Sequence, residues 1–266
     1  MEPSPQTSTQ SITISVITVV RNDRDGLLRT LESCAAQTFD SFEHVIFDGA
    51  STDGTAELLA AWRTDVRTVK RSERDGGIYD AMNKAVQMAS GELLIFMNAG
   101  DTFTGTDDLG FVASEWHAGG WRWGYGASRY VRDGQPIQGI VQAPFRLRRF
   151  ELGLTFVPHQ SAYIERTLFH ELGGYRLDVG LSADQQLLMR AARMSPPAVW
   201  IRFLSDFELG GAHSKSSEMA RVRRWHRIRK MDDRLILGSN IADSVFSIAH
   251  GVAQLTRRLL SEALRR

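Results

Sequence analysis

The strongest constraint on the fold of this chain is an alternation of strand-like and helical segments over its first hundred residues or so. The strand-like runs are short, apolar and rich in β-branched residues, and they lie at 12–20, 43–47, 66–71 and 92–97. Between them, apolar residues recur at helical spacing behind Asp, Asn or Gly residues that favour helix starts. Such alternation forms βαβ units, so we predict an α/β fold with a mainly parallel sheet flanked by helices.

Polar residues follow the predicted strands. Asn22, Asp48, Asp75 and Asp101 each lie at or near a strand end. Right-handed crossovers bring the carboxyl ends of parallel strands to one edge of the sheet, where ligands of open α/β sheets bind. Carboxylates at that edge can accept from the donors of a nucleoside or hold a metal ion. Asp53 lies nearby, but a helix cap is its simpler interpretation.

Two common phosphate-binding loops are missing from the sequence. There is no GxxxxGK[ST] segment, and no GxGxxG segment follows the first strand. Their absence disfavours a P-loop nucleotidase and a dinucleotide dehydrogenase. The phosphates of a bound nucleotide would therefore need a metal ion and side chains to neutralise them.

After residue 101 the alternation ends. The pattern predicts a hairpin of strands at 121–131 and 135–141, then a strand at 161–164, a helix at 182–194 and a strand at 199–203.

Several segments, in this order and at this spacing, resemble the family 2 glycosyltransferases of GT-A fold. The resemblance is dense over 12–103, in SVITVVRND, VIFDGASTDGT and RDGGIYDAMNKAVQMASGELLIFMNAGD, and 75–101 is its most specific part. It continues sparsely through HQSAYIER, GGYR, SADQQLLMR and ELGGAHS. It implies a Rossmann-like donor half at 12–105 and an acceptor-binding, catalytic-base half of the same domain at 106–215.

The resemblance also implies an inverting transfer of a sugar from a nucleoside-diphosphate sugar to a hydroxyl group. Many similar bacterial enzymes act on glycan or lipid-linked acceptors at the inner face of the membrane, in polysaccharide or glycolipid synthesis. Two other functions stay open. A sugar nucleotidyltransferase can share the sheet but would need a glycine-rich loop after the first strand. A non-catalytic nucleotide-sugar binder or membrane scaffold could retain the fold.

The donor site implied by the resemblance lies at the predicted sheet edge. Asp48 resembles the acid that contacts the nucleoside, and Asp75 resembles the residue beside the base. Asn83 and Lys84 lie on the helix behind Asp75, and Asn22 follows the first strand.

The metal motif departs from the family pattern. It reads Asn98-Ala99-Gly100-Asp101, so an amide replaces the first acid and Asp101 alone remains. We still expect Mn²⁺ or Mg²⁺, with His213 at the position of a further metal or diphosphate ligand in some relatives. Asp184 resembles the catalytic base, although an acid in the first turn of a helix also stabilises the helix dipole. His159 is near the acceptor half and could equally be structural.

The last fifty residues lie outside the resemblance. Apolar residues recur there at intervals of three and four, at Ile241, Val245, Ile248, Val252, Leu255 and Leu259. Arginine-rich segments at 221–234 and 257–266 flank them, so 216–266 is predicted to be a basic amphipathic helical tail. Three roles compete: packing on the domain or in a homodimer, lying on an anionic membrane surface, or binding nucleic acid.

The composition of the chain bears on its partners and its location. The net charge is +1, and nothing outside the tail resembles a nucleic-acid-binding fold, so nucleic acid is not an expected partner. Cys34 is the only cysteine, which excludes an intramolecular disulfide and fits a reducing, cytoplasmic location. We predict that the Cys34 thiol is buried in the core. Residues 1–11, rich in Ser, Thr, Gln and Pro, are predicted to be a disordered N-terminus.

Overall fold

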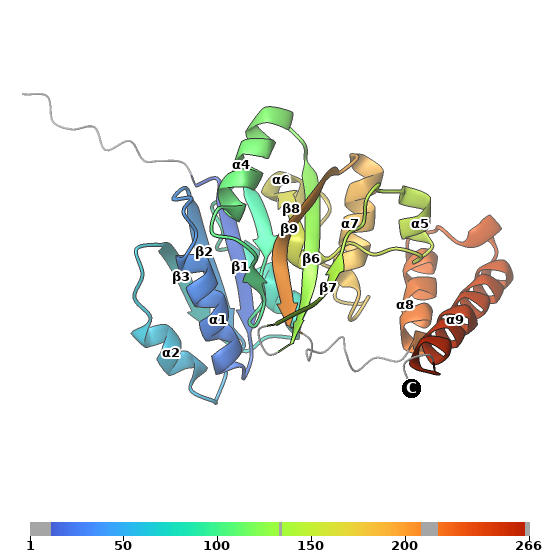
Figure 1. Ribbon diagram of the computed structural model, residues 1–266, viewed down its shortest axis with the longest axis horizontal. Helices are drawn as coiled ribbons and strands as arrows, with labels where there is room; N and C mark the ends of the chain where they lie inside the picture. Colours follow the sequence, from blue (N-terminus) through green and yellow to red (C-terminus); the bar gives the residue numbers. More distant parts are fainter. Residues whose placement is uncertain (1–11, 133–134, 209–217, 264–266) are drawn as a thin grey trace, which may run out of the picture.

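A nine-stranded mixed sheet runs through the molecule. The computed structural model describes residues 12–132, 135–208 and 218–263. In this part of the chain the strand order is β3-β2-β1-β4-β8-β6-β9-β5, with β7 paired to β6 (Figure 1). The strands are β1 (Ile14–Val20), β2 (Phe42–Asp48), β3 (Arg67–Ser72), β4 (Leu93–Phe96), β5 (Thr102–Phe103), β6 (Trp123–Arg132), β7 (Gln135–Ile140), β8 (Ala162–Glu165) and β9 (Ala198–Glu208). The helices are α1 (Arg24–Ala35), α2 (Thr55–Ala61), α3 (Ile78–Val86), α4 (Asp108–Gly119), α5 (Leu147–Glu151), α6 (Arg166–Glu171), α7 (Ala183–Met194), α8 (Glu218–Met231) and α9 (Asn240–Ala263).

The predicted parallel half is confirmed. β1 pairs in parallel with β2 and β4, and β2 pairs in parallel with β3. Asp23 caps α1, because its side chain accepts a hydrogen bond of 3.0 Å from the amide of Gly26. Every residue of β1 is buried, as expected for a central strand covered on both faces.

The second half continues the same sheet with mixed directions. β8 lies antiparallel between β4 and β6, whereas β9 runs parallel to β6. The predicted hairpin is confirmed as β6 and β7, while residues 133–134 lie outside the described part. The strand expected at 199–203 is longer, because β9 pairs along β6 as far as Glu208. Helices α4, α5 and α6 and the short strand β5 were not predicted.

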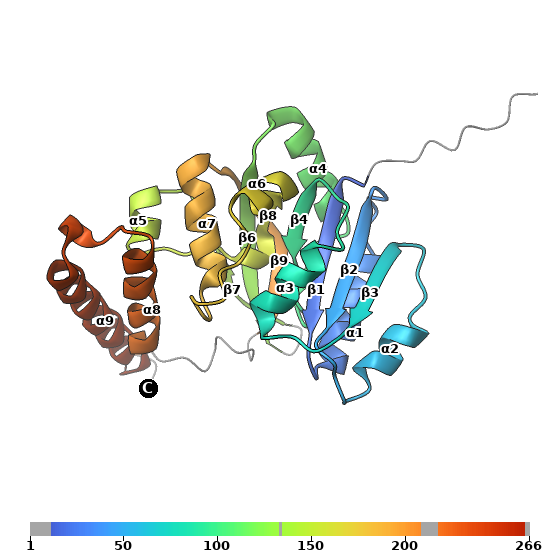
Figure 2. The same ribbon diagram turned by 180° about the vertical axis from the view of Figure 1, so that it is seen from behind.

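Helices cover both faces of the sheet. One face packs against α3, α6 and α7, which lie together in Figure 2, and the other packs against α1 and α4. Cys34 of α1 belongs to the second of these cores and is buried as predicted. Burial raises the pKa of its thiol, which disfavours the reactive thiolate form.

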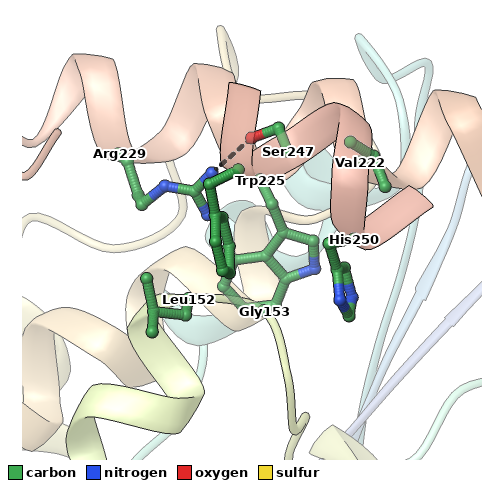
Figure 3. A pocket seen from close by; sticks show the side chains of 8 residues that line it. Leu152, Gly153, Val222, Trp225, Arg229, Ser247 and His250 are labelled. Carbon is green, nitrogen blue, oxygen red and sulfur yellow. Dashed lines mark hydrogen bonds between the residues drawn. The ribbon is translucent and has the colours of Figure 1, made fainter. Parts of the chain in front are cut away.

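The predicted helical tail is confirmed as a hairpin of α8 and α9 at the end of the molecule opposite β3 (Figures 1 and 2). α8 joins the main core through Trp225 and Ile228. The Trp225 indole lies against Gly153, and Arg229 bonds Ser247 of α9 (Figure 3). No helix in the described ranges is both long and apolar enough to cross a bilayer.

A buried ion pair holds α9 on α8. The Arg229 guanidinium donates to both carboxylate oxygens of Asp243, at 2.7 and 2.9 Å. His226 and the amide of Ile236 also bond this carboxylate. Burial alone would raise the pKa of Asp243, but the hydrogen bonds from Arg229 and His226 hold it below its usual value. Every charged atom of the pair therefore has a partner.

Removing one member of this pair should loosen the tail. We expect Asp243→Ala to lower the free energy of unfolding by about 3 to 5 kcal/mol, since it leaves the Arg229 charge buried without a counter-ion. Urea denaturation would measure the loss. Ser244→Ala, at the next position of α9, is the matched control and should have almost no effect. Equal denaturation midpoints for the two variants would contradict the role assigned to the pair.

Candidate functional site

The loop after β2 is organised around Asp48. This carboxylate is fully buried and accepts from the Ser51 amide at 3.2 Å and from the Ser72 hydroxyl at 2.6 Å. The Ser51 hydroxyl also donates to it. Asp48 thus links the end of β2 to the end of β3, and its side chain does not face solvent. Its expected contact with a nucleoside stays a prediction, and its burial favours an indirect part in shaping the loop.

Asn22 connects this loop to the end of β1. Its backbone φ is 51°, a left-handed conformation that Asn tolerates better than most residues. Its amide donates to the Ser51 hydroxyl, and its side-chain oxygen accepts from the Thr52 amide, both at 2.8 Å. The structure therefore brings Asn22 and Asp48 to the same edge, as the strand ends predicted.

Asp75 lies directly over this edge. Its carboxylate accepts from the Gly77 amide at 2.8 Å. A Cβ atom at Gly49 would come within 2.3 Å of the other carboxylate oxygen, so any larger residue at position 49 would displace the Asp75 carboxylate. The backbone that follows β2 and the acid that precedes α3 are therefore in contact.

Asn83 and Lys84 lie behind Asp75 on α3, as expected, but both make internal bonds. The Asn83 amide donates to the carbonyl of Tyr175 and accepts from its N–H, each at 2.9 Å. Lys84 donates to the carbonyl of Arg74 at 3.0 Å and pairs with Asp80 at 3.2 Å. Asn83 thus fixes the 173–175 turn and Lys84 fixes the loop that carries Asp75. For both residues the geometry favours positioning over direct contact with a donor.

Asn98 and Asp101 lie in the turn that follows β4. The Asp101 amide donates to the Asn98 carbonyl at 3.0 Å, and the hydroxyl of Thr30 bonds the Asp101 carbonyl at 2.8 Å. Burial raises the pKa of the Asp101 carboxyl well above its usual value, and nearby Asp23 adds to this, against hydrogen bonds from Asn98 and Gln160. A cation beside Asp101 would oppose that shift.

These residues fit a hard divalent cation in part. The side-chain oxygen of Asn98 is buried and has no hydrogen-bond partner, so a ligand oxygen is free beside the Asp101 turn. Mg²⁺ and Mn²⁺ prefer oxygen ligands, and Mg²⁺ commonly binds one or two protein groups together with substrate phosphates and water. Among the described residues, no three His, Cys, Asp or Glu side chains gather as a metal site. His213 lies outside the described residues.

Asp184 stands at the start of α7 and is largely buried. Its two oxygens accept from the Tyr79 hydroxyl at 2.8 Å and from the Gln185 amide at 2.9 Å. Gln185 is itself held by the backbone of Val157. Burial, with the adjacent Asp184 carboxylate, raises the pKa of Tyr79 well above its usual value, so its hydroxyl remains a proton donor. Both neighbours therefore fix the direction in which the carboxylate points.

His159 bridges the two halves of the site. Its Nε2 lies 3.3 Å from the Asn98 amide nitrogen, and its Nδ1 lies 3.8 Å from the Asp184 carboxylate. An amide nitrogen can only donate, so Nε2 accepts and the proton of a neutral ring resides on Nδ1, facing Asp184. A continuous path of side chains thus runs from the end of β4 to the predicted base.

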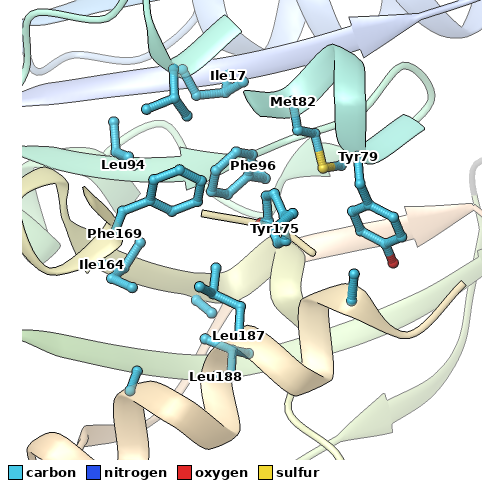
Figure 4. Packing of buried hydrophobic residues seen from close by; sticks show 14 of the residues in the cluster. Ile17, Tyr79, Met82, Leu94, Phe96, Ile164, Phe169, Tyr175, Leu187 and Leu188 are labelled. Carbon is cyan, nitrogen blue, oxygen red and sulfur yellow. The ribbon is translucent and has the colours of Figure 1, made fainter. Parts of the chain in front are cut away.

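The residues that surround Asp184 were not predicted from the sequence. Tyr79 comes from α3 and packs its ring 5.1 Å from that of Tyr175 (Figure 4). The available signal was the position of Tyr79 within DGGIYDAMNKA, the most specific part of the resemblance. Gln185 carried no signal of its own beyond its place beside Asp184.

Comparison with known proteins identifies the family. The model of glycosyl transferase family 2 matches residues 15–172. A protein of Mycobacterium tuberculosis named as an uncharacterized glycosyltransferase is 37% identical over 210 residues, 77% of this chain and 79% of the relative. A PGL/p-HBAD biosynthesis glycosyltransferase of Mycobacterium bovis is 27% identical over 241 residues, 84% of this chain and 88% of the relative.

Solved structures share the fold. Residues 1–349 of S. aureus TarS in complex with UDP-GlcNAc superpose with a TM-score of 0.68 and 18% identity, over 88% of this chain and 70% of that one. The mannosyltransferase PcManGT from Pyrobaculum calidifontis, in complex with GDP-Man and Mn²⁺, gives 0.62 and 19%, over 93% and 75%. The predicted GT-A fold is thereby confirmed. The matched residues, the fold and the 37% identical relative together make this chain a member of glycosyl transferase family 2.

Proposed function

We propose that this glycosyltransferase transfers a sugar from a nucleoside-diphosphate sugar to an acceptor hydroxyl with inversion at the anomeric carbon. The observation that carries the proposal is the path from Asn98 through His159 to Asp184. It joins the turn suited to a diphosphate with a carboxylate that two hydrogen bonds orient.

The chemistry requires one proton acceptor and one leaving group. The acceptor oxygen attacks the anomeric carbon as the bond from that carbon to the diphosphate oxygen breaks, and the nucleoside diphosphate leaves with the electron pair. The hydroxyl proton passes to Asp184, which acts as the general base. Tyr79 and Gln185 keep the carboxylate pointed at the acceptor, so little reorientation is needed when the substrate arrives.

Asn98 and Asp101 would hold Mn²⁺ or Mg²⁺ through their side-chain oxygens. When bound, the ion neutralises the negative charge that develops on the departing diphosphate. PcManGT was solved with GDP-Man and Mn²⁺, which supports a metal of this kind.

The nucleoside part of the donor would lie over Asp75 and Gly49, at the edge where Asn22 and Ser51 join two loops. Asp48, Asn83 and Lys84 would act from behind, by holding the loops that make this surface. TarS was solved with UDP-GlcNAc, which supports a nucleoside-diphosphate sugar as the donor.

The acceptor we propose is a glycan or lipid-linked intermediate. The M. bovis relative is named for PGL/p-HBAD biosynthesis, and a Bacillus subtilis relative that is 31% identical over 136 residues is named for teichuronic acid biosynthesis. Both names describe biosynthetic glycosyltransferases, which supports an acceptor of this kind. We place the transfer on the cytoplasmic side, where nucleotide sugars are available.

A donor-binding test can use the close contact between Gly49 and Asp75. At a hundredfold excess over its Kd, a nucleoside diphosphate should stabilise the wild type by about 2.7 kcal/mol, which raises the melting temperature by roughly 5 to 10 °C. Gly49→Ala should abolish most of that increase, because the new methyl group displaces Asp75. A panel of nucleoside diphosphates and their sugars, read by thermal shift, measures both.

The matched control is Gly110→Ala on α4, where an added Cβ meets only ordinary contacts at 3.7 Å or more. It should keep the full ligand-induced increase. If Gly49→Ala keeps it as well, the nucleoside does not lie over Asp75. Binding of a sugar donor without turnover to any acceptor or to water would favour the non-catalytic binder instead.

A further inference from the structure

The tail helix α9 presents its apolar side to solvent. Ile241, Val245, Ile248 and Val252 are 78, 62, 57 and 53% exposed. They follow one another at intervals of four, three and four residues, so they form one stripe along the helix. Leu237, in the turn before α9, is 91% exposed. Contiguous apolar surface of this kind is unusual on a soluble monomer and marks an interaction site.

The opposite side of α9 is the one that packs on the protein. Asp243 and Ser247 are buried against α8, where both bond Arg229. Phe246 of α9 also lies by this guanidinium, with its ring centroid 5.7 Å away. Most amphipathic helices of a globular domain bury their apolar face and expose their polar one. In α9 the polar face is buried and the apolar face is exposed.

The ion pair makes this orientation specific. Rotating α9 to bury the stripe would take Asp243 away from Arg229 and leave a charge without a partner next to Trp225. The exposed stripe is therefore a fixed feature of the fold, and something outside the described residues must cover it if it is to leave water.

The outer face of α8 indicates what kind of partner covers the stripe. Arg223, Arg227 and Lys230 of α8 are exposed and recur at intervals of four and three residues, and Arg234 is exposed in the turn after α8, next to the exposed Asp233. Core contacts and α9 occupy the other sides of α8, so Arg223, Arg227 and Lys230 face solvent on the same helical hairpin that carries the stripe. α9 itself has no exposed acid between residues 240 and 256. The hairpin thus combines an apolar stripe on α9 with exposed cations on α8.

We infer that this surface, formed by α8 and α9, docks the protein on an anionic lipid bilayer. A helix with one apolar side lies in the interface with that side among the acyl chains, while neighbouring Lys and Arg residues meet the anionic headgroups. A second copy of the chain is the less suitable occupant. Pairing two α9 stripes would bring two cation-rich hairpins together, with Asp233 as the one exposed acid between residues 222 and 256 to compensate them.

The inference is independent of the catalytic proposal, because it can be tested without turnover. Full-length protein would be sedimented with vesicles of phosphatidylcholine alone and with vesicles that also contain phosphatidylglycerol. We expect binding to the anionic vesicles, and we expect added salt to weaken it. No binding to either kind of vesicle would overturn the inference.

Variants test which residues are responsible. Val245→Glu with Ile248→Glu should weaken vesicle binding by at least about tenfold, because charged side chains replace the inserted apolar ones. Both positions are exposed, so the melting temperature should not change. Ile201→Glu on β9, at a site 81% exposed, is the matched control and should bind as the wild type does. An equal loss in this control would show that the stripe is not the docking surface.

The cations are tested separately. Arg227→Gln with Lys230→Gln should weaken binding to anionic vesicles by roughly fivefold for each charge removed. Light scattering tests the competing occupant. A dimer that Val245→Glu with Ile248→Glu dissociates, in a protein that binds no vesicles, would replace the lipid with a second copy.

Discussion

Asp184→Asn should reduce the rate of sugar transfer by roughly a thousandfold, the range expected when a general base is lost. The amide occupies the same space and can still accept from the Tyr79 hydroxyl, but it cannot take a proton from the acceptor. Donor binding should persist, since the contacts over Asp75 are unchanged. The measurement is the turnover number with saturating donor, together with the ligand-induced rise in melting temperature.

Asp178→Asn is the matched control for this variant. Asp178 is an exposed acid in the segment just before α7, and it pairs with Arg176 at 2.8 Å. Its replacement should leave turnover within about twofold of the wild type, as for most surface substitutions. An Asp184→Asn enzyme with normal turnover would mean that another group accepts the proton. Loss of both turnover and donor binding would point instead to a damaged site.

Asp101→Asn should cost roughly a hundred- to a thousandfold in turnover, because the charge that develops on the diphosphate would lose its counter-ion. A chelator should impose a similar loss on the wild type. The two effects should not multiply, since both remove the same ion. Turnover of each protein with and without chelator, and with Mn²⁺ or Mg²⁺ restored, measures this directly.

Stability provides an internal check on Asp101. Burial raises the pKa of this carboxyl, which means that the fold disfavours its charged form. A neutral amide should therefore leave the melting temperature of the metal-free protein unchanged or higher.

The control for turnover is Asp40→Asn, which replaces an exposed acid after α1. A wild type that keeps its full rate in chelator would show that Asp101 acts without a metal.

Local patterns predicted the parts of the fold that depend on neighbouring residues. β1 to β4 and α1 to α3 follow from runs of β-branched residues and from caps such as Asp23. β5 has only two residues, and it exists because Thr102 and Phe103 pair with residues of β9 about a hundred positions away. α4 escaped prediction because glycines interrupt it and large aromatic residues surround its short buried stripe. β5 is thus determined by contacts between distant residues, whereas α4 lacks a clear helical pattern of its own.

In the site, too, local sequence patterns predicted some residues, whereas others depend on contacts between distant parts of the chain. The positions of Asp75 and Asp101 followed from strand ends and from the family resemblance. The surroundings of Asp184 did not, because Tyr79 lies 105 positions away along the chain. Asn83 combines both cases. Its place on α3 was predicted, but its bonds to Tyr175 depend on a turn 92 positions later.

The continuous sheet has a consequence for how the enzyme meets its substrates. β4 carries the turn with Asp101, and β8 follows the short helical turn at His159–Ser161 that presents His159. These two strands are hydrogen-bonded neighbours, from Leu93 opposite Glu165 to Ile95 opposite Tyr163. In this part of the chain the turn that carries Asp101 and the turn that carries His159 thus belong to one continuous sheet, and we expect them to move together. The entropy of bringing them together is lost once, during folding, and does not have to be supplied again in each catalytic cycle.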